Sequence, residues 1–424
     1  MARRHRGAAD LYGALIPAWQ GHRSTEPLAK DSPAARAMLL AAAPWPRLAS
    51  ALGDLDRAYP ETVTARVARI NQAARTEGVP YWLDVQTVRA RPIVLSYRID
   101  SRHHFQAART RLEVLRLARV DRLRVEMGLL GQASPNGPLV FLNRIEDEWS
   151  RLLSPIGGAA SPLDLAIRKT LRELAEHAVG ESIVPLVERL AQREAAYVVM
   201  EKRMRVTIPK PPGLYWPRDW FVEKAALTRF ENGRGPMIFN SDLQAVQDAN
   251  ARLDEPRFHE AMRELVALRA EGVEAHEARH AVEIPEPPLP PFLRGGDNAF
   301  FLDQINRELR AYLGELHDTP RSPCLGLSAL LAASYGSKSR STPHAYVGRI
   351  LVHTLGKDPK ALLPYLIDPG DPDASPPPGL GNTTDEAAFL RDNCAKPRAL
   401  LRAEVEILWR ALYNAPMPVV SRID

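Results

Sequence analysis

The residues with the clearest capacity for chemistry form a His-Glu-x-x-His sequence from His276 to His280. On an α-helix the two histidines are four residues apart, so they project from one face with Cβ atoms roughly 6 Å apart. That separation allows both imidazoles to bind one tetrahedral zinc ion at about 2.0–2.1 Å per bond. Glu277 lies one residue further round the helix, where it can reach a metal-bound water and act as its general base. The pattern predicts a hydrolytic site whose cofactor is Zn²⁺.

The residues around this motif favour a helix. Ala, Glu, Arg and His predominate, and neither Gly nor Pro occurs from Val273 to Ile284. Gly272 and Pro285 are expected to mark its two ends, with a separate helix over 256–269 leading to it across a joint at Gly272. The alternative interpretation is a solvated helix with two ordinary histidines, and the helical context favours the metal site.

A third metal ligand is expected on the stretch Asn298–His317, which has the periodicity of an amphipathic helix. Its apolar stripe consists of Phe301, Ile305, Leu309, Tyr312 and Leu316. Glu308 lies in the middle of that stripe, and a carboxylate that faces a core needs a partner because an unpaired buried charge is costly. A metal ion is such a partner, so Glu308 is the predicted third ligand.

Other assignments for this carboxylate remain open. Glu315 is one heptad beyond Glu308 on the same face, which makes it the first alternative ligand. An ion pair with one of the many arginines is the alternative role for Glu308 itself. Glu283 follows His276 by seven residues and is expected to orient a ligand by hydrogen bonding.

The motif and the downstream glutamate resemble the zincin metallopeptidases, and within them the gluzincins, whose third ligand is a Glu on a following helix. The resemblance covers residues 255–320. It implies a zinc-dependent metallopeptidase that hydrolyses peptide bonds of a peptide or protein substrate with a metal-activated water and Glu277 as general base. Glu274 and Arg279 are charged where zincins usually have uncharged residues, and there the chain departs from the pattern.

The same resemblance implies further site residues. Gluzincins commonly supply a His or Tyr that hydrogen-bonds the oxyanion. His344 and Tyr346 are the first candidates for this catalytic role, and Tyr335 and Tyr312 are further candidates. Zincins also have an edge strand before the metal helix, along which peptide substrates lie extended. A short strand expected over 235–240, or one of the earlier strands, is the candidate here.

Periodicity and Pro/Gly content predict an α+β, predominantly helical fold, in which a small antiparallel sheet module is followed by a helical module. The resemblance implies that this helical module is zincin-like and binds the metal. The expected modules are an N-terminal helical arm (1–75), a small α+β module (76–156), a helical linker module with an aromatic segment (157–250) and a helical zincin-like catalytic module (251–424). Strands are expected over 81–85 and 93–99, while 112–120 fits either a third strand or a helix.

Composition sets limits on location. The 45% hydrophobic and 25% charged content is ordinary for a globular protein, and no stretch approaches the ~18 apolar residues of a membrane span. No signal peptide is recognised at the N-terminus. Cys324 and Cys394 do not make a disulfide framework, which favours a reducing compartment, so a cytoplasmic location is expected. An exported chain whose signal has been removed is the alternative.

Charge gives a weaker indication of partners. The net charge is +5, and ten arginines occur from Arg89 to Arg124. Because the pattern lacks the regularly interleaved aromatics that base stacking uses, a solvated surface is favoured over a nucleic-acid face. His103 and His104 are adjacent, so they cannot both face one metal from a regular element and are expected at the surface or in a loop. The alternative function is a non-catalytic helical interaction protein with a structural or vestigial metal site, which a fourth protein ligand would close.

Overall fold

A computed structural model gives the fold of this chain, and the statements below concern the residues it describes. These are residues 8–15, 33–53, 63–88, 91–107, 110–121, 130–134, 137–153, 161–204, 214–215, 240–282, 299–335, 342–355 and 383–424.

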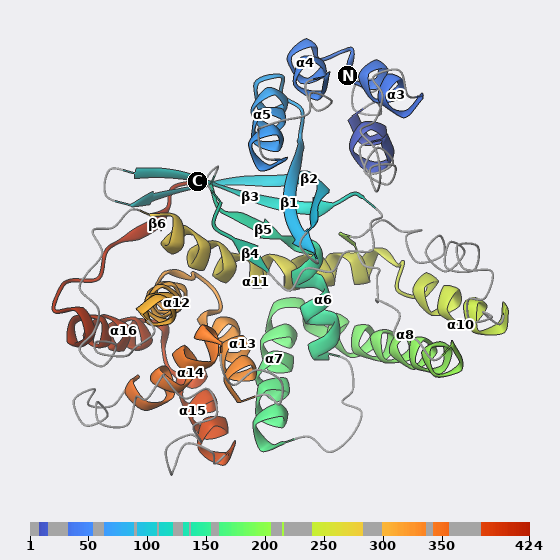
Figure 1. Ribbon diagram of the computed structural model, residues 1–424. Coiled ribbons are helices and arrows are strands. Elements are labelled where there is room, and N and C mark those ends of the chain that lie inside the picture. Colours follow the sequence, from blue (N-terminus) through green and yellow to red (C-terminus); the bar gives the residue numbers. More distant parts are fainter. Residues whose placement is uncertain are drawn as a thin grey trace.

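A curled β-sheet lies between two groups of helices (Figure 1). The N-terminal group consists of η1 (Leu11–Leu15), α3 (Pro33–Ala42), α4 (Pro46–Gly53) and α5 (Val63–Thr76), and α5 packs on strand β1. On the other side, helix α11 packs against strands β3, β4 and β5, and the remaining helices lie beyond it. The expected α+β, predominantly helical fold is confirmed.

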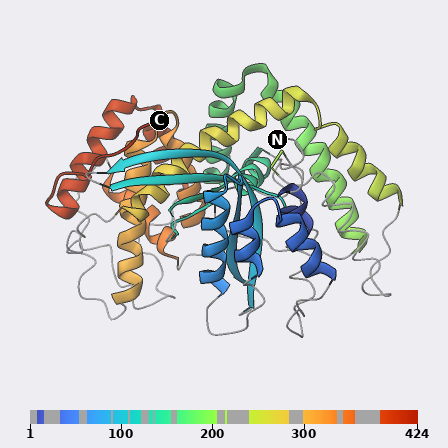
Figure 2. The ribbon, with the colours of Figure 1, turned by 90° about the horizontal axis from the view of Figure 1, so that it is seen from above.

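The sheet has the strand order β1-β2-β3-β5-β4, with β6 paired to β2. The strands are β1 (Tyr81–Val88), β2 (Arg91–Ala107), β3 (Thr110–Arg119), β4 (Gly131–Gln132), β5 (Leu139–Phe141) and β6 (Val420–Arg422). The ambiguous stretch 112–120 is therefore largely strand. Most neighbours are antiparallel, but β3 and β5 run parallel, so the sheet is mixed where an antiparallel one was expected. Figure 2 shows the long strands β2 and β3 arching over the helices.

Helices make up most of the described chain after β5. They are α6 (Leu142–Leu153), α7 (Pro162–Val179), η4 (Gly180–Ser182), α8 (Ile183–Met204), α10 (Asn240–Ala251), α11 (Pro256–Ala281), α12 (Ala299–Asp318), α13 (Pro323–Tyr335), α14 (Pro343–Thr354), α15 (Thr383–Ala395) and α16 (Arg398–Tyr413). Local chemistry explains some of these starts. Ser161, for example, forms a capping box with Asp164 at the start of α7.

The expected joint at Gly272 is wrong, because α11 is one continuous helix of 26 residues. A Cβ atom at this position would lie 2.7 Å from Oε1 of Glu315 on α12. Glycine therefore serves the close approach of a buried side chain here, and it does not break the helix. The expected strand over 235–240 lies outside the described residues except for Asn240, which begins α10.

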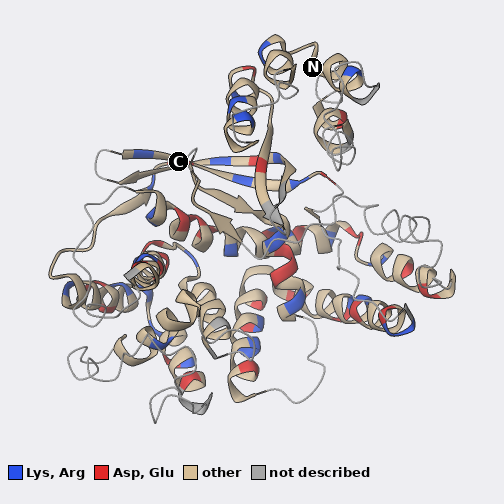
Figure 3. Cartoon of the chain, viewed as in Figure 1, with Lys and Arg blue, Asp and Glu red and all other residues tan. Residues whose placement is uncertain are grey.

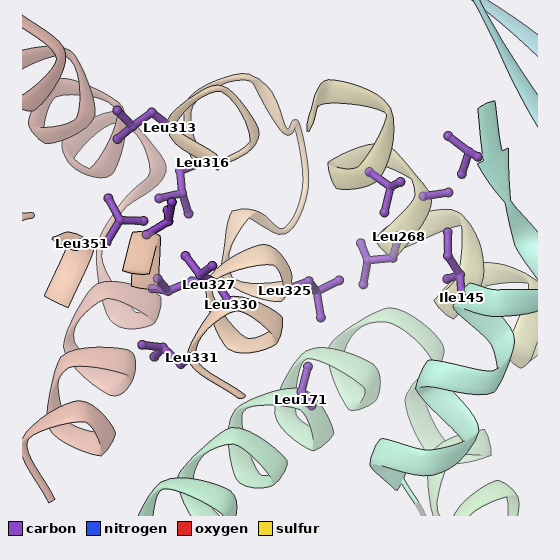
Figure 4. Close-up of a cluster of buried hydrophobic side chains, with 14 of the residues drawn as sticks. Ile145, Leu171, Leu268, Leu313, Leu316, Leu325, Leu327, Leu330, Leu331 and Leu351 are labelled. Carbon is purple, nitrogen blue, oxygen red and sulfur yellow. The ribbon is translucent and has the colours of Figure 1, made fainter. Parts of the chain in front are cut away.

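The largest apolar core joins the sheet to the C-terminal helices (Figure 4). Its central side chains are mostly leucines, including Leu268 on α11, Leu313 and Leu316 on α12, Leu325, Leu327, Leu330 and Leu331 on α13, and Leu351 on α14. A second core packs the N-terminal helices against one face of β1 and β2. The helices α11 and α12, which carry His276, His280 and Glu308, are thus held rigidly by apolar contacts on several sides.

Cys324 on α13 and Cys394 on α15 form a disulfide. Two cysteines 70 residues apart give no spacing signal for a bond, and the packing of α13 on α15 brings them together. Disulfides persist in oxidising compartments, so these cysteines do not support a reducing compartment or the cytoplasmic location drawn from it. Among the described helices, none combines the length and hydropathy that a membrane crossing requires.

The arginine-rich stretch is partly buried. Arg119 is 3% exposed and donates to Oδ1 of Asp121 at 3.1 and 2.9 Å. Arg116 donates to the buried Glu274 of α11. The interpretation of this stretch as a solvated surface is therefore wrong for these two arginines, while Arg98 on β2 is exposed as expected. Figure 3 shows the basic residues of β2 and β3 above the acidic residues of α11.

Candidate metal centre

Helix α11 brings the two motif histidines together. His276 and His280 lie one turn apart, and their Nε2 atoms are 3.2 Å from each other. Both imidazoles are largely buried, with 10% and 11% of their side-chain surface exposed. Two ring nitrogens at this distance cannot both carry a proton, so at least one lone pair points into the space between them.

Glu308 on α12 completes a cluster of three ligand groups. Its Oε2 lies 3.3 Å from Nε2 of His276, and its Oε1 lies 3.6 Å from Nε2 of His280. Ligand atoms about 2.0–2.1 Å from a tetrahedral metal are separated from one another by roughly 3.3 Å. The three measured separations match that edge length, and the three residues offer ligand atoms that all lie within 4.8 Å of one another.

Unsatisfied polar atoms around this cluster also fit a cation. Oε2 of Glu308 and Nδ1 of His344 are buried without a hydrogen-bond partner among the described residues. Buried polar atoms without partners are rare and each calls for an explanation such as an ion. Two imidazoles and a carboxylate form a donor set that zinc commonly takes, so the residues present fit that metal.

The charges of the cluster are strongly coupled. Burial acts against protonation of His276, but Glu308 and Glu315 outweigh it and raise the pKa of His276 to about 10. Burial acts to raise the pKa of Glu308, and the two histidines reverse this and hold that pKa well below its ordinary value. For His280, burial lowers the pKa below its ordinary value. A metal ion must therefore displace a proton from His276 as it binds.

Glu277 faces the edge of the sheet. It is 8% exposed, and burial raises its pKa to about 7, opposed by His276 and by the backbone N–H of Ala133. A Cβ at Gly131 of β4 would lie 2.6 Å from Cγ and 2.8 Å from Oε1 of Glu277, so only glycine permits this approach. β4 ends the order of the described strands and lies beside the motif, but neither the stretch 235–240 nor the strands expected over 81–85, 93–99 and 112–120 include its residues.

Glu315, the alternative ligand, lies behind His276. Its Oε2 is 3.4 Å from Nδ1 of His276, the nitrogen that faces away from the cluster. Its Oε1 accepts a hydrogen bond from Arg269 at 2.5 Å, and Arg269 also pairs with Glu148 at 3.2 Å. Glu315 is 2% exposed, and a Cβ at Gly326 of α13 would overlap its carboxylate. This placement suits a residue that orients His276 better than one that binds the metal.

The two charged departures from the zincin pattern have specific partners. Glu274 is 1% exposed and accepts hydrogen bonds from Nε and Nη2 of Arg116 at 2.7 and 2.9 Å. Arg279 donates to Asp318 of α12 at 3.0 and 2.6 Å. The first pair fixes α11 to the sheet and the second fixes it to α12. Both charged side chains therefore help to position α11.

His103 and His104 do not lie in a loop, because both belong to strand β2, where they are partly exposed. Adjacent residues of a strand face opposite sides of a sheet. Nδ1 of His103 accordingly lies 2.5 Å from Glu274, and Nδ1 of His104 lies 2.8 Å from Asp424. His103 thus contributes to the contact between the sheet and α11.

The candidates for an oxyanion contact lie in different surroundings, and one of them is exposed beside the cluster. Nδ1 of His344 lies 3.3 Å from Oε2 of Glu308, and 43% of the His344 side chain is exposed. Tyr346 packs against the ring of Phe301, with ring centroids 5.4 Å apart, and no described contact joins it to the metal ligands. The ring of Tyr312 packs edge-on against the imidazole of His276, with ring centroids 4.6 Å apart. His344 is thus the exposed candidate at the cluster.

Two sequence candidates have no described side chain. Glu283 lies outside the described residues, and the side chain of Tyr335 is not described either. Sequence reasoning missed Arg269, although it precedes His276 by seven residues and so shares its helix face. It also missed Gly131, whose contact depends on tertiary structure alone.

Comparison with known proteins adds no assignment. No protein-family model, no curated protein and no solved structure matches this chain.

Proposed function

We propose that this protein is a zinc-dependent metallopeptidase. The observation that supports it most directly is the convergence of His276, His280 and Glu308 at separations of 3.2, 3.3 and 3.6 Å. Glu277, a buried carboxylate, follows the first ligand directly in the chain. Two ligands and a base on one turn, with a third ligand from a following helix, are the arrangement that peptide hydrolysis by a metal-activated water needs.

A bound zinc ion would polarise the scissile carbonyl and lower the pKa of a coordinated water toward ~7. The carboxylate of Glu277 would accept a proton from that water and deliver it to the leaving amine. Burial acts to raise the pKa of Glu277, which favours a group that can hold a proton between the two steps. His344, exposed beside Glu308, would donate to the carbonyl oxygen as it gains charge.

The edge strand supports a peptide as substrate. Among the described strands, β4 pairs with β5 alone and ends the strand order, so its outer side can pair with an extended chain. Gly131 of this strand touches Glu277, and a peptide added to the strand would therefore lie beside the base. Peptide bonds in an extended segment are the substrate that this geometry favours.

The test is hydrolysis of a peptide library by the zinc-loaded chain, followed by mass spectrometry. Glu277→Gln should keep one zinc per chain and lose turnover, because it removes the base and none of the ligands. Glu264→Gln, a partly exposed carboxylate on the same helix, is the matched control and should cleave as wild type. Cleavage that survives Glu277→Gln would exclude this mechanism.

The second candidate is a non-catalytic protein with a structural metal site, and the position of His344 favours testing it. A fourth protein ligand would close the coordination, and Nδ1 of His344 is near enough to Glu308 to become one. His344→Ala should leave zinc affinity unchanged in the peptidase. A large loss of zinc in that variant, together with absent cleavage, would support the structural site.

A further inference from the structure

A second possible binding site lies between α6, α7, α11 and α13, where the described residues enclose a cavity of about 350 Å³. Its apolar walls include Trp149 on α6, Ile167 and Leu171 on α7, and Leu325 on α13. Figure 4 shows Leu171 and Leu325 on the two helices that face each other across this region. Small-molecule sites commonly occupy about 300–1,000 Å³, so this volume suits a small ligand.

One buried polar atom on the wall lacks a partner. Ser328 of α13 lines the cavity and is 1% exposed, yet its hydroxyl has no hydrogen-bond partner among the described residues. Serines within helices usually satisfy the hydroxyl on the carbonyl four residues earlier, as Ser334 does with Leu330 on the same helix. The hydroxyl of Ser328 is thus an unsatisfied polar group in the wall of the cavity.

The charged lining has a positive excess. Glu148 and Arg269 both line the cavity and neutralise each other, with Nε of Arg269 3.2 Å from the carboxylate. Arg151 of α6 is the further charged residue of the lining, and no described carboxylate lies within ion-pair distance of it. One positive charge beside apolar walls is complementary to a molecule with an apolar body and one negative charge.

We propose that this cavity binds a small amphipathic carboxylic acid. The apolar chain would lie against Trp149, Leu171 and Leu325, and the carboxylate would pair with Arg151. The hydroxyl of Ser328 would donate to an oxygen of the ligand. A neutral alcohol of the same length would lose the ion pair, and an amine would be repelled by Arg151.

A ligand bound in this cavity would also affect the candidate metal centre. Arg269 lines this cavity and donates to Glu315, which lies 3.4 Å from Nδ1 of His276. A ligand that shifts Arg269 thus changes the contact that orients a metal ligand. The binding itself does not depend on peptidase activity, so it can be tested whether or not the chain cleaves peptides.

The experiment is calorimetric titration of the zinc-loaded full chain with octanoate, octan-1-ol and octylammonium in turn. Octanoate should bind saturably to one site per chain, at least about tenfold more tightly than either of the others. Arg151→Gln, which changes an exposed side chain, should remove the preference for octanoate over octanol. Ala329→Phe should fill the cavity and abolish binding, whereas the matched control Ala195→Phe, on an exposed position of α8, should bind as wild type.

Several outcomes would overturn the proposal. Absence of saturable binding to the wild type would show that the cavity takes no such acid. Equal affinities for the three probes, or an unchanged preference in Arg151→Gln, would show that the negative charge is not recognised. Undiminished binding in a folded Ala329→Phe variant, checked by circular dichroism, would place the octanoate elsewhere.

Discussion

Replacing Glu315 with glutamine would remove one negative charge from behind His276 while keeping the size of the side chain. The carboxylate is 2% exposed and its partner Arg269 is 5% exposed. Breaking a buried ion pair costs roughly 3–5 kcal/mol, and the lower end applies here because Arg269 keeps Glu148 at 3.2 Å. The metal-free variant should therefore lose about 3 kcal/mol of stability, measured by urea unfolding.

The same change should weaken zinc binding. Loss of a partner that orients a metal-bound histidine typically costs 10–100-fold in affinity, about 1.4–2.8 kcal/mol. Competition with a zinc indicator would measure it, with Glu308→Gln as the control that removes a ligand. Wild-type zinc affinity in Glu315→Gln would refute the orienting role. A loss as large as that in Glu308→Gln would instead make Glu315 a ligand.

Three further changes test other contacts. Gly131→Ala should destabilise the fold by about 1–3 kcal/mol in urea unfolding, because the new methyl group would lie 2.6 Å from Cγ of Glu277; a wild-type midpoint would mean that the strand can move away freely. Glu146→Gln should remove a pH dependence of stability. Burial raises the pKa of Glu146 from 4.5 to about 7, so between these pH values the folded state holds a proton that the unfolded state has released. The free energy of unfolding should therefore fall by about 3 kcal/mol as the pH rises from 4.5 to about 7. Unfolding at pH 5 and 7.5 measures this, and an equal pH slope in both proteins would contradict it. Cys324→Ser should lower the free energy of unfolding by about 4 kcal/mol, because the disulfide to Cys394 closes a loop of 70 residues in the unfolded chain. Thermal unfolding of the oxidised wild type and of the variant measures this difference. Coincident unfolding curves would show that the two cysteines are not cross-linked in solution.

Local periodicity was enough to predict most elements of the fold. The stretch from Asn298 to His317 carries an apolar stripe at helical spacing, and helix α12 covers nearly the same residues. Glu308 could be selected as a ligand because a carboxylate within such a stripe requires a partner. Gly272 was misjudged by the same local reasoning, since a glycine that breaks a helix and one that admits a neighbouring side chain look identical in sequence.

Contacts between distant segments could not be predicted. The sheet is mixed because β5 returns beside β3 in parallel, which depends on the path of the intervening chain. The disulfide depends on the packing of α13 against α15. Glu274 was noted only as a departure from a pattern, yet Arg116 and His103 from two strands meet it in space.

The sequence by itself determined the spacing of His276, Glu277 and His280 on one helix, because the α-helix fixes the direction of side chains four residues apart. It also determined that Glu308 faces the core, since the apolar stripe sets which side of α12 is buried. Tertiary structure alone decided that Glu308 meets the two imidazoles at metal-ligand separations. It likewise decided that Glu315 supports His276 from behind. Such contacts depend on how the helices pack together, and the packing is set by the whole core.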